Sequence, residues 1–285
     1  MTSREIWIKG ARPKTLVAAL APVIVGTAFA GYDAEFLNFF LALIVALALQ
    51  IGVNYANDYS DGIRGTDDDR IGPIRLVGSG LAKPFEVKRA AFLAFIVAAI
   101  AGVILSARTE WLLLIVGGLA IIAAWTYTGG PKPYGYQALG EVSVFIFFGL
   151  VATLGTYFVQ VGSISWPVIL AAISMGLLAT AILNVNNLRD LERDAKSGKR
   201  TLAVRLGPKR TRALYRVTIF LPLLLSILLV TQSAYFLITL ILLPQLLRAS
   251  RLVSSAAHIE LLGRTGQIQI TYSLALSLAS LLAAR

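Results

Sequence analysis

The sequence is dominated by long apolar segments that are too numerous and too continuous for a water-soluble fold. Nine segments of about 20 mostly apolar residues occur in the 285-residue chain, and that length lets a helix cross a bilayer. They run near residues 15–32, 36–57, 88–106, 111–128, 141–161, 166–188, 212–231, 233–248 and 267–284. None shows the alternation of a transmembrane β-strand. The sequence therefore predicts an all-α membrane protein with nine transmembrane helices, forming a single domain over residues 1–285.

The composition supports this class and excludes several kinds of chemistry. Hydrophobic residues make up 57% of the chain and charged residues only 14%, against about 25% charged in a typical soluble domain. The chain has no cysteine, which excludes disulfides, thiolate-held metals and thiol nucleophiles, and its single histidine, His258, excludes a multi-histidine metal site. Carboxylates, amides, basic side chains, tyrosines and bound cations remain for chemistry.

The basic residues are distributed unequally between the two ends of the segments. With the N-terminus in the cytoplasm, 24 of the 26 Lys and Arg residues fall on inward segments, and only Arg108 and Arg285 fall outside. The positive-inside rule then predicts a cytoplasmic N-terminus and an external C-terminus. The net charge of +11 would suggest nucleic-acid binding in a soluble domain, but charges that flank membrane segments argue against it. A signal peptide ending at residues 28–30 is the alternative for the first segment.

Two of the inward loops begin with the same arrangement of amide and carboxylate side chains. The sets are Asn54, Asp58 and Asp61 after the second segment, and Asn186, Asp190 and Asp194 after the sixth. If the helices continue into the loops, spacings of i, i+4 and i+7 or i+8 place each set on one helix face. Oxygen ligands without His or Cys favour Mg²⁺, which takes only one or two carboxylates and completes its shell with water and phosphate. Two separate sets therefore predict two Mg²⁺ ions that hold one diphosphate.

The repeat of this arrangement four segments apart suggests a duplicated four-helix unit with a ninth helix added. Such a duplication would place the two sets on either side of one central cavity. Basic residues that follow the sets, Arg64, Lys199 and Arg200, would complete the neutralisation of a diphosphate, although Lys199 and Arg200 also fit a purely topological role. Solvated loop acids are the simpler interpretation for Asp67, Asp68, Asp69, Glu192 and Glu260.

Two further inward loops, 72–81 and 128–136, combine glycine and proline with apolar residues. We interpret them as covers over a site between helices, with ordinary connectors as the alternative. Tyr127, Tyr134 and Tyr136 would lie beside a cation or an aromatic ring, or simply at the membrane interface. We assign Glu141 no chemical role, because the helix dipole alone favours a carboxylate at the start of a helix.

The paired motifs resemble those of the UbiA superfamily of intramembrane prenyltransferases. The first matches the family's Asn-Asp-x-x-Asp core at Asn57, Asp58 and Asp61, and the second matches Asp-x-x-x-Asp at Asp190 and Asp194. The resemblance covers essentially the whole chain. It implies a helical bundle around a central cavity, set in a bacterial-type inner membrane with the active site facing the cytoplasm.

Four stretches are similar to the menaquinone-pathway subgroup of that superfamily, which prenylates 1,4-dihydroxy-2-naphthoate. They are Arg12–Thr15, Arg64–Asp67, Gly72–Gly80 and Tyr127–Tyr136. Gly65 stands where the wider superfamily often has a further Asp, and this departure belongs to the same subgroup pattern. The aspartate pairs alone indicate only the superfamily, whereas the loops indicate the subgroup.

The resemblance implies Mg²⁺-dependent transfer of a polyprenyl group from polyprenyl diphosphate to dihydroxynaphthoate, with loss of carbon dioxide, giving demethylmenaquinol. The catalytic residues it implies are Asp58, Asp61, Asp190 and Asp194, which hold Mg²⁺, and Tyr127, which shields the carbocation. The substrate-binding residues it implies are Arg12, Asn54, Asn57, Arg64, Arg75, Lys132, Asn186 and Lys199. Among these, Asn54 and Asn186 support the ions, Arg64, Lys132 and Lys199 meet the diphosphate, and Arg12 and Arg75 meet the acidic aromatic substrate.

Two alternative functions remain open at this point. A UbiA-type prenyltransferase for another aromatic acceptor, such as 4-hydroxybenzoate, would carry the same aspartate pairs. A cation-coupled transporter would use carboxylates in the membrane as ion sites. The acids here cluster at one membrane face rather than near the midplane, which disfavours transport.

Overall fold

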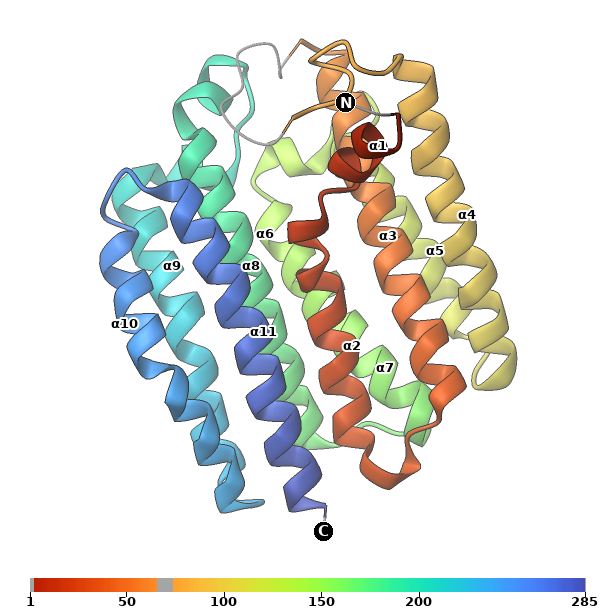
Figure 1. Ribbon diagram of the computed structural model, residues 1–285, viewed down its shortest axis with the longest axis vertical. Coiled ribbons are helices and arrows are strands. Elements are labelled where there is room, and N and C mark those ends of the chain that lie inside the picture. The colour runs from red at the N-terminus through yellow and green to blue at the C-terminus, as the bar shows by residue number, and fades with distance from the viewer. Residues whose placement is uncertain (1–2, 66–73, 285) are drawn as a thin grey trace.

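The computed structural model describes residues 3–65 and 74–284, and within these ranges it contains helices and connecting loops but no β-strand (Figure 1). The long helices are α3 (Phe36–Gly62), α4 (Pro84–Arg108), α8 (Trp166–Lys196), α9 (Leu202–Leu229) and α11 (His258–Ala283). The shorter helices are α1 (Ser3–Ala11), α2 (Val17–Ala30), α5 (Leu113–Thr126), α6 (Gly140–Val144), α7 (Ala152–Val161) and α10 (Leu243–Leu252). Single turns and irregular helices are η1 (Pro13–Thr15), η2 (Gly31–Asp33), η3 (Tyr134–Gln137), the π-helical η4 (Phe145–Val151) and η5 (Ala234–Leu242).

Seven helices of the described chain are long and apolar enough to cross a membrane. An eighth span results if α1 and α2, which are bent by 52° at the break between them, are counted together. Helix α5 has 14 residues and is about 21 Å long, less than the roughly 30 Å of a bilayer core. The all-helical, multi-pass membrane class expected from the sequence is confirmed, whereas the count of nine spans stays a prediction.

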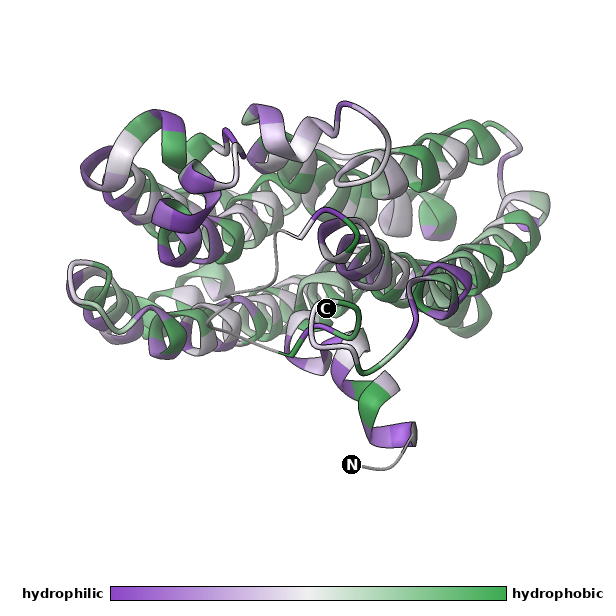
Figure 2. Cartoon of the chain, turned by 90° about the horizontal axis from the view of Figure 1, so that it is seen from above, coloured by the Kyte–Doolittle hydropathy of each residue, from purple (hydrophilic) through white to green (hydrophobic). Residues whose placement is uncertain are grey.

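Helices α3 and α8 extend beyond the apolar segments predicted for them. Their 27 and 31 residues make rods of about 40 and 46 Å, so each projects past a bilayer core of about 30 Å. Each helix carries the two aspartates of its motif on this extension, as the sequence analysis assumed. Figure 1 shows both motif-bearing ends at the end of the bundle where α1 lies. Figure 2 looks onto that end. The hydrophilic residues lie mainly in loops and at helix ends, and the hydrophobic residues lie along the helices.

Helix α1 was not predicted, because it is polar on average and hydropathy does not mark it. It is attached to α3 by the hydroxyl of Tyr55, which donates to the carbonyl oxygen of Trp7 at 2.8 Å. The chain then breaks at Arg12, whose φ of 52° and ψ of 68° lie in the left-handed region that a non-glycine residue rarely adopts. Pro13 begins the short turn η1 that leads into α2.

Small residues allow close helix packing in the interior. A Cβ added to Gly149 of η4 would lie 2.3 Å from the Cα of Gly176 on α8, and one added to Gly26 of α2 would lie 2.5 Å from the Thr153 carbonyl oxygen. Inside a membrane such van der Waals contact is a main source of helix association. The main apolar core joins α8, α9, α10 and α11 to α2. The other side of the bundle holds smaller apolar clusters of α3, α4, α5 and α7 and a cavity between these helices.

Candidate active site

A cavity of about 410 Å³ lies among α2, α3, α4, α5, η4–α7 and α8, and residues of both aspartate motifs line it. The charged lining residues of the described chain are Arg12, Arg75, Arg189, Arg193 and Lys199, with Asp61, Asp190 and Asp194. The remaining wall is mostly Ala, Val, Gly, Leu and Phe. Because five basic side chains face three acidic ones, the polar end of the cavity carries a positive potential and favours an anionic ligand.

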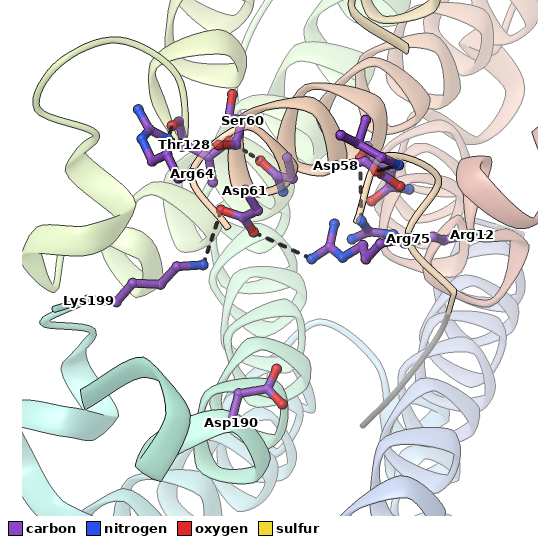
Figure 3. A network of polar contacts seen from close by, with 12 residues as sticks. Arg12, Asp58, Ser60, Asp61, Arg64, Arg75, Thr128, Asp190 and Lys199 are labelled. Atoms are coloured by element: carbon purple, nitrogen blue, oxygen red, sulfur yellow. Dashed lines mark hydrogen bonds and ion pairs between the residues drawn. The ribbon is translucent and has the colours of Figure 1, made fainter. Parts of the chain in front are cut away.

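Asp61 is the acid of the first motif that faces the cavity. Its carboxylate forms ion pairs with Lys199 Nζ at 3.1 Å and with Arg75 NH2 at 3.6 Å (Figure 3). It also accepts a hydrogen bond from the Tyr136 hydroxyl. Lys199 follows the second motif, so this carboxylate connects the two motif-bearing helices. One turn earlier, Asn57 also lines the cavity and its Oδ1 accepts from Thr128 Oγ1 at 2.7 Å.

Asp58 has different surroundings from Asp61. Its side chain is fully buried and lies outside the cavity lining, and its two oxygens accept the backbone N–H groups of Leu76 at 2.8 Å and Val77 at 3.0 Å. These charge-assisted bonds fasten residues 74–77 to α3 and hold Arg75 beside Asp61. The sequence grouped Asp58 with the metal ligands, whereas in the structure its oxygens face a loop backbone.

Asn54 lines the cavity, but its amide is also engaged with the chain. Its Nδ2 donates to the carbonyl oxygen of Ala11 at 2.8 Å and to Thr15 Oγ1 at 3.0 Å, while Arg12 NH2 lies 3.4 Å from the Asn54 carbonyl oxygen. These bonds hold the break between α1 and α2 in place, so the strained backbone of Arg12 is tolerated. The guanidinium of Arg12 thereby reaches the cavity.

The second motif places its acids on the cavity wall together with two arginines. Arg189 donates to both oxygens of Asp190, at 2.8 and 2.7 Å, and Arg193 NH2 lies 3.7 Å from Asp190 Oδ1. Asn186 and Asp194 line the same wall. The sequence analysis assigned no site role to Arg189 or Arg193. The position of Arg193, three residues after Asp190, predicts contact with its carboxylate, whereas helical spacing does not predict the contact of the adjacent Arg189.

Arg64 and Lys132 lie outside the cavity lining. The guanidinium of Arg64 donates to the carbonyl oxygens of Thr128 and Gly130 and so ties the turn before η3 to the end of α3. The side chain of Lys132 is exposed on that turn. A diphosphate contact for these two residues stays a prediction. Asp67–Asp69 and the first residues of the 72–81 loop lie outside the described residues.

Three tyrosines surround the polar end of the cavity. Tyr127 and Tyr134 line it and pack edge to face, with ring centroids 5.5 Å apart. Burial raises the pKa of the Tyr134 phenol, so it stays protonated at neutral pH. A neutral aromatic ring is attracted to a cation and does not act as a base. The third, Tyr136, lies with its ring centroid 4.6 Å from Lys199 Nζ.

Glu141, which received no role from the sequence, is buried next to the second motif. Its Oε1 accepts a hydrogen bond from Asn187 Nδ2 at 2.9 Å, and Asn187 lines the cavity beside Asn186. Ionisable residues inside a membrane segment are costly and are therefore functional candidates. Its position in the sequence, at the start of an apolar segment, gave no signal of this pairing.

The oxygen donors at the cavity suit Mg²⁺. Hard oxygen ligands line this one cavity: the carboxylates of Asp61, Asp190 and Asp194 and the side-chain amides of Asn57 and Asn186. Within residues 3–65 and 74–284, no three carboxylate or histidine side chains converge on one point. This suits an ion that is bound through one or two carboxylates and completes its shell with water and substrate phosphate.

The helical bundle combines two Asn/Asp motifs with a cavity that is basic at its polar end and apolar elsewhere. These features define an intramembrane protein that binds a molecule with one anionic end and one apolar end. The chain belongs to the UbiA prenyltransferase family, which residues 19–258 match.

Sequence and structure comparisons give relatives of this family. The chain is 46% identical over 283 residues to the 1,4-dihydroxy-2-naphthoate octaprenyltransferase of Mycobacterium tuberculosis, covering 97% of each protein. It is 49% identical over 257 residues to the Mycobacterium leprae protein of the same name, covering 90% of this chain and 87% of that one. The fold is similar to that of a UbiA homolog from Archaeoglobus fulgidus bound to DMAPP and Mg²⁺, with a TM-score of 0.69, 15% identity, and coverage of 95% of this chain and 98% of that one.

Proposed function

We propose that the protein transfers a polyprenyl group from polyprenyl diphosphate to 1,4-dihydroxy-2-naphthoate in menaquinone biosynthesis, with release of carbon dioxide. The observation that carries this proposal is that two Asn/Asp motifs, more than 120 residues apart, line one cavity whose polar end is basic and whose other walls are apolar. High identity to proteins named for dihydroxynaphthoate supports the choice of acceptor over 4-hydroxybenzoate.

The polar end binds the diphosphate of the donor. Lys199 and Arg189 neutralise its oxygens. The guanidinium of Arg189 offers paired N–H donors, whereas the ammonium of Lys199 acts as a point charge. Asp61 with Asn57, and Asp190 and Asp194 with Asn186, would each hold one Mg²⁺. When bound, Mg²⁺ draws negative charge onto the diphosphate and so favours its departure from the allylic carbon.

The apolar walls and Tyr127 protect the allylic cation that this departure leaves. The bond between the allylic carbon and the diphosphate oxygen breaks, and the ring carbon that bears the carboxylate of the acceptor forms the new carbon–carbon bond. The carboxylate then leaves as carbon dioxide, and its bonding pair restores the aromatic ring, so no net proton transfer is needed there. The ring of Tyr127 stabilises the cation, and the apolar walls limit the access of water that would trap it.

Arg12 and Arg75 bind the carboxylate of the acceptor before it is lost. Both line the cavity from non-helical segments, and both are held there by α3, through Asn54 and Asp58 respectively. The polar end faces the cytoplasm of a bacterial-type inner membrane. This orientation rests on the excess of Lys and Arg in the inward segments.

Purified protein given dihydroxynaphthoate or 4-hydroxybenzoate, with a prenyl diphosphate and Mg²⁺, tests the proposal. We expect a prenylated naphthol and carbon dioxide from the naphthoate and no product from the hydroxybenzoate. Turnover of hydroxybenzoate alone would refute the acceptor but keep the reaction class. Ion-dependent substrate flux into liposomes, with no covalent product in any assay, would refute the enzyme altogether.

A further inference from the structure

Three glycines from three different helices face the cavity without any packing partner. They are Gly102 on α4, Gly117 on α5 and Gly155 on α7, and all three line the cavity. A Cβ added to Gly117 or Gly155 would have no atom within 4 Å, and one added to Gly102 would meet only Val45 Cγ2 at 3.9 Å. None of the three has a positive φ, so the backbone does not require glycine there.

Several other helical glycines have a packing reason that these three lack, whereas Gly118, Gly263 and Gly266 are also free of neighbours but lie outside the cavity lining. An added Cβ would come within 3.0 Å of a neighbour at Gly26, Gly52, Gly149 and Gly176. A glycine inside a helix destabilises that helix relative to alanine. At positions where alanine would fit freely, glycine therefore leaves room for something outside the chain.

The three glycines lie in the half of the cavity that is remote from the motifs. Along α3 the lining extends from Asp61 to Ala42, which is about 28 Å of helix and close to the thickness of a bilayer core. Gly102 is level with Val45, near the far end of that stretch. Gly117 lies in the first turns of α5, directly after the far connection from α4.

Gly155 lies one turn before Val159, whose carbonyl oxygen accepts from Asn38 Nδ2 at 2.9 Å near the start of α3. The walls between this level and the motifs are apolar and include Ala46, Phe148 and Val151. An isoprenoid chain attached to a diphosphate at the polar end would run along these walls toward the three glycines.

We propose that Gly102, Gly117 and Gly155 set the length of the isoprenoid tail that the cavity accepts. This inference rests on the proposed function, because it takes the occupant to be the tail of a prenyl diphosphate. A larger side chain at any of the three positions would occupy the space of the distal isoprene units and leave the diphosphate end of the site unchanged.

The test is competition between donors of different length. Gly117→Leu and Gly155→Leu are given an equimolar mixture of short- and long-chain prenyl diphosphates with dihydroxynaphthoate and Mg²⁺, and the products are quantified by mass spectrometry. We expect the ratio of long-chain to short-chain product to fall about tenfold or more, because added methylenes in a filled apolar pocket discriminate to that degree. Turnover of the shortest donor should stay at the wild-type rate. Alanine at the same positions should give a smaller shift in the same direction.

Gly118 provides a matched control on α5. It is adjacent to Gly117, exposed, outside the cavity lining, and equally free of neighbours within 4 Å. Gly118→Leu should leave the product ratio unchanged. An unchanged ratio in both leucine variants at positions 117 and 155, or an equal shift in Gly118→Leu, would overturn the proposal.

A binding measurement separates this inference from the proposed function. Prenyl diphosphates with Mg²⁺ should raise the thermal unfolding midpoint of the detergent-solubilised protein. In Gly117→Leu and Gly155→Leu the protection by a long-chain donor should be lost while that by a short-chain donor remains. If the wild type prenylates no naphthoate, the proposed function fails, and this shift still decides whether the three glycines limit the tail. Equal protection by both donors in the variants contradicts the inference even if the enzyme is active.

Discussion

The two aspartate motifs have nearly the same spacing but different surroundings. In the first, only Asn57 and Asp61 present their polar groups mainly to the cavity, because Asp58 binds the backbone of residues 74–77 and Asn54 binds the break after α1. In the second, the three motif side chains all line the cavity. The difference arises because the 74–82 loop and α1 fold over α3, whereas the 197–201 connection after α8 leads across the cavity and delivers Lys199 to Asp61. Equal spacing on a helix thus fixes a shared face but not what that face contacts.

The largest expected effect comes from the acids that face the cavity. Asp61→Asn and Asp190→Asn should each lower turnover about 100-fold or more, because each removes a charge from a site built to stabilise a leaving diphosphate. The measurement is kcat at several Mg²⁺ concentrations. Glu260→Gln is a suitable control, since that acid is exposed and paired with Arg264. Near-normal turnover of either variant at subsaturating Mg²⁺ would remove the basis for treating the motifs as metal sites.

Asp58→Asn should separate a positioning role from a ligand role. The amide can accept only one of the two backbone N–H groups with its oxygen, and leaving the other unpaired costs about 1–3 kcal/mol of unfolding free energy. Turnover should fall about tenfold through a higher KM for the acceptor, because Arg75 loses its support. The Mg²⁺ concentration for half-maximal turnover should stay at the wild-type value. A large increase in that concentration, with unchanged stability, would place Asp58 among the ligands instead.

Glu141 tests whether the second motif also depends on support from outside it. Glu141→Ala removes the acceptor for Asn187 Nδ2 and should lower kcat/KM about fivefold, equivalent to about 1 kcal/mol. Glu141→Gln retains an acceptor and should remain close to the wild type. If the glutamine variant is as impaired as the alanine variant, the charge itself is required rather than the hydrogen bond.

The smallest effect is expected at the contact between the two motif-bearing regions. Tyr136→Phe removes the hydroxyl that donates to Asp61 but keeps the ring next to Lys199, so kcat/KM should fall only about threefold. Lys199→Ala, measured in parallel, should be far more damaging because it removes the cation. Equal losses in the two variants would show that the hydroxyl, and not the charge, sets the position of Asp61.

The sequence predicted those parts of the fold and site that depend on local pattern. Apolar length predicted the membrane helices. Helical spacing of i, i+4 and i+7 or i+8 predicted a site at Asp58, Asp61, Asp190 and Asp194, and in the structure Asp61, Asp190 and Asp194 line one cavity. Helix α1 was missed because hydropathy marks only residues in contact with lipid or core. The backbone contacts of Asp58 were not foreseen for another reason: its partners, Leu76 and Val77, are backbone groups that no side-chain pattern records. Its assignment as a metal ligand stays a prediction.

Arg189 and Glu141 illustrate the same limit within the site. Arg189 was counted only as part of a basic loop, because a positive charge at a membrane boundary already has a topological explanation. Glu141 lies 46 residues from Asn187, and only the packing of α6 against α8 brings them together. Tertiary packing, rather than local spacing, decides which charged side chains reach the cavity.

The short length of α5 has a consequence for the bilayer around the protein. This helix is about 9 Å shorter than an average hydrocarbon core, and Trp111 just before it is exposed, as expected for an interfacial anchor. If α5 crosses the bilayer, as the sequence predicts, the lipids beside it compress to match it, at a modest cost for each ångström of mismatch. Thin bilayers should suit this flank of the protein better than thick ones. The stability of the protein should therefore depend on the acyl-chain length of the surrounding lipids.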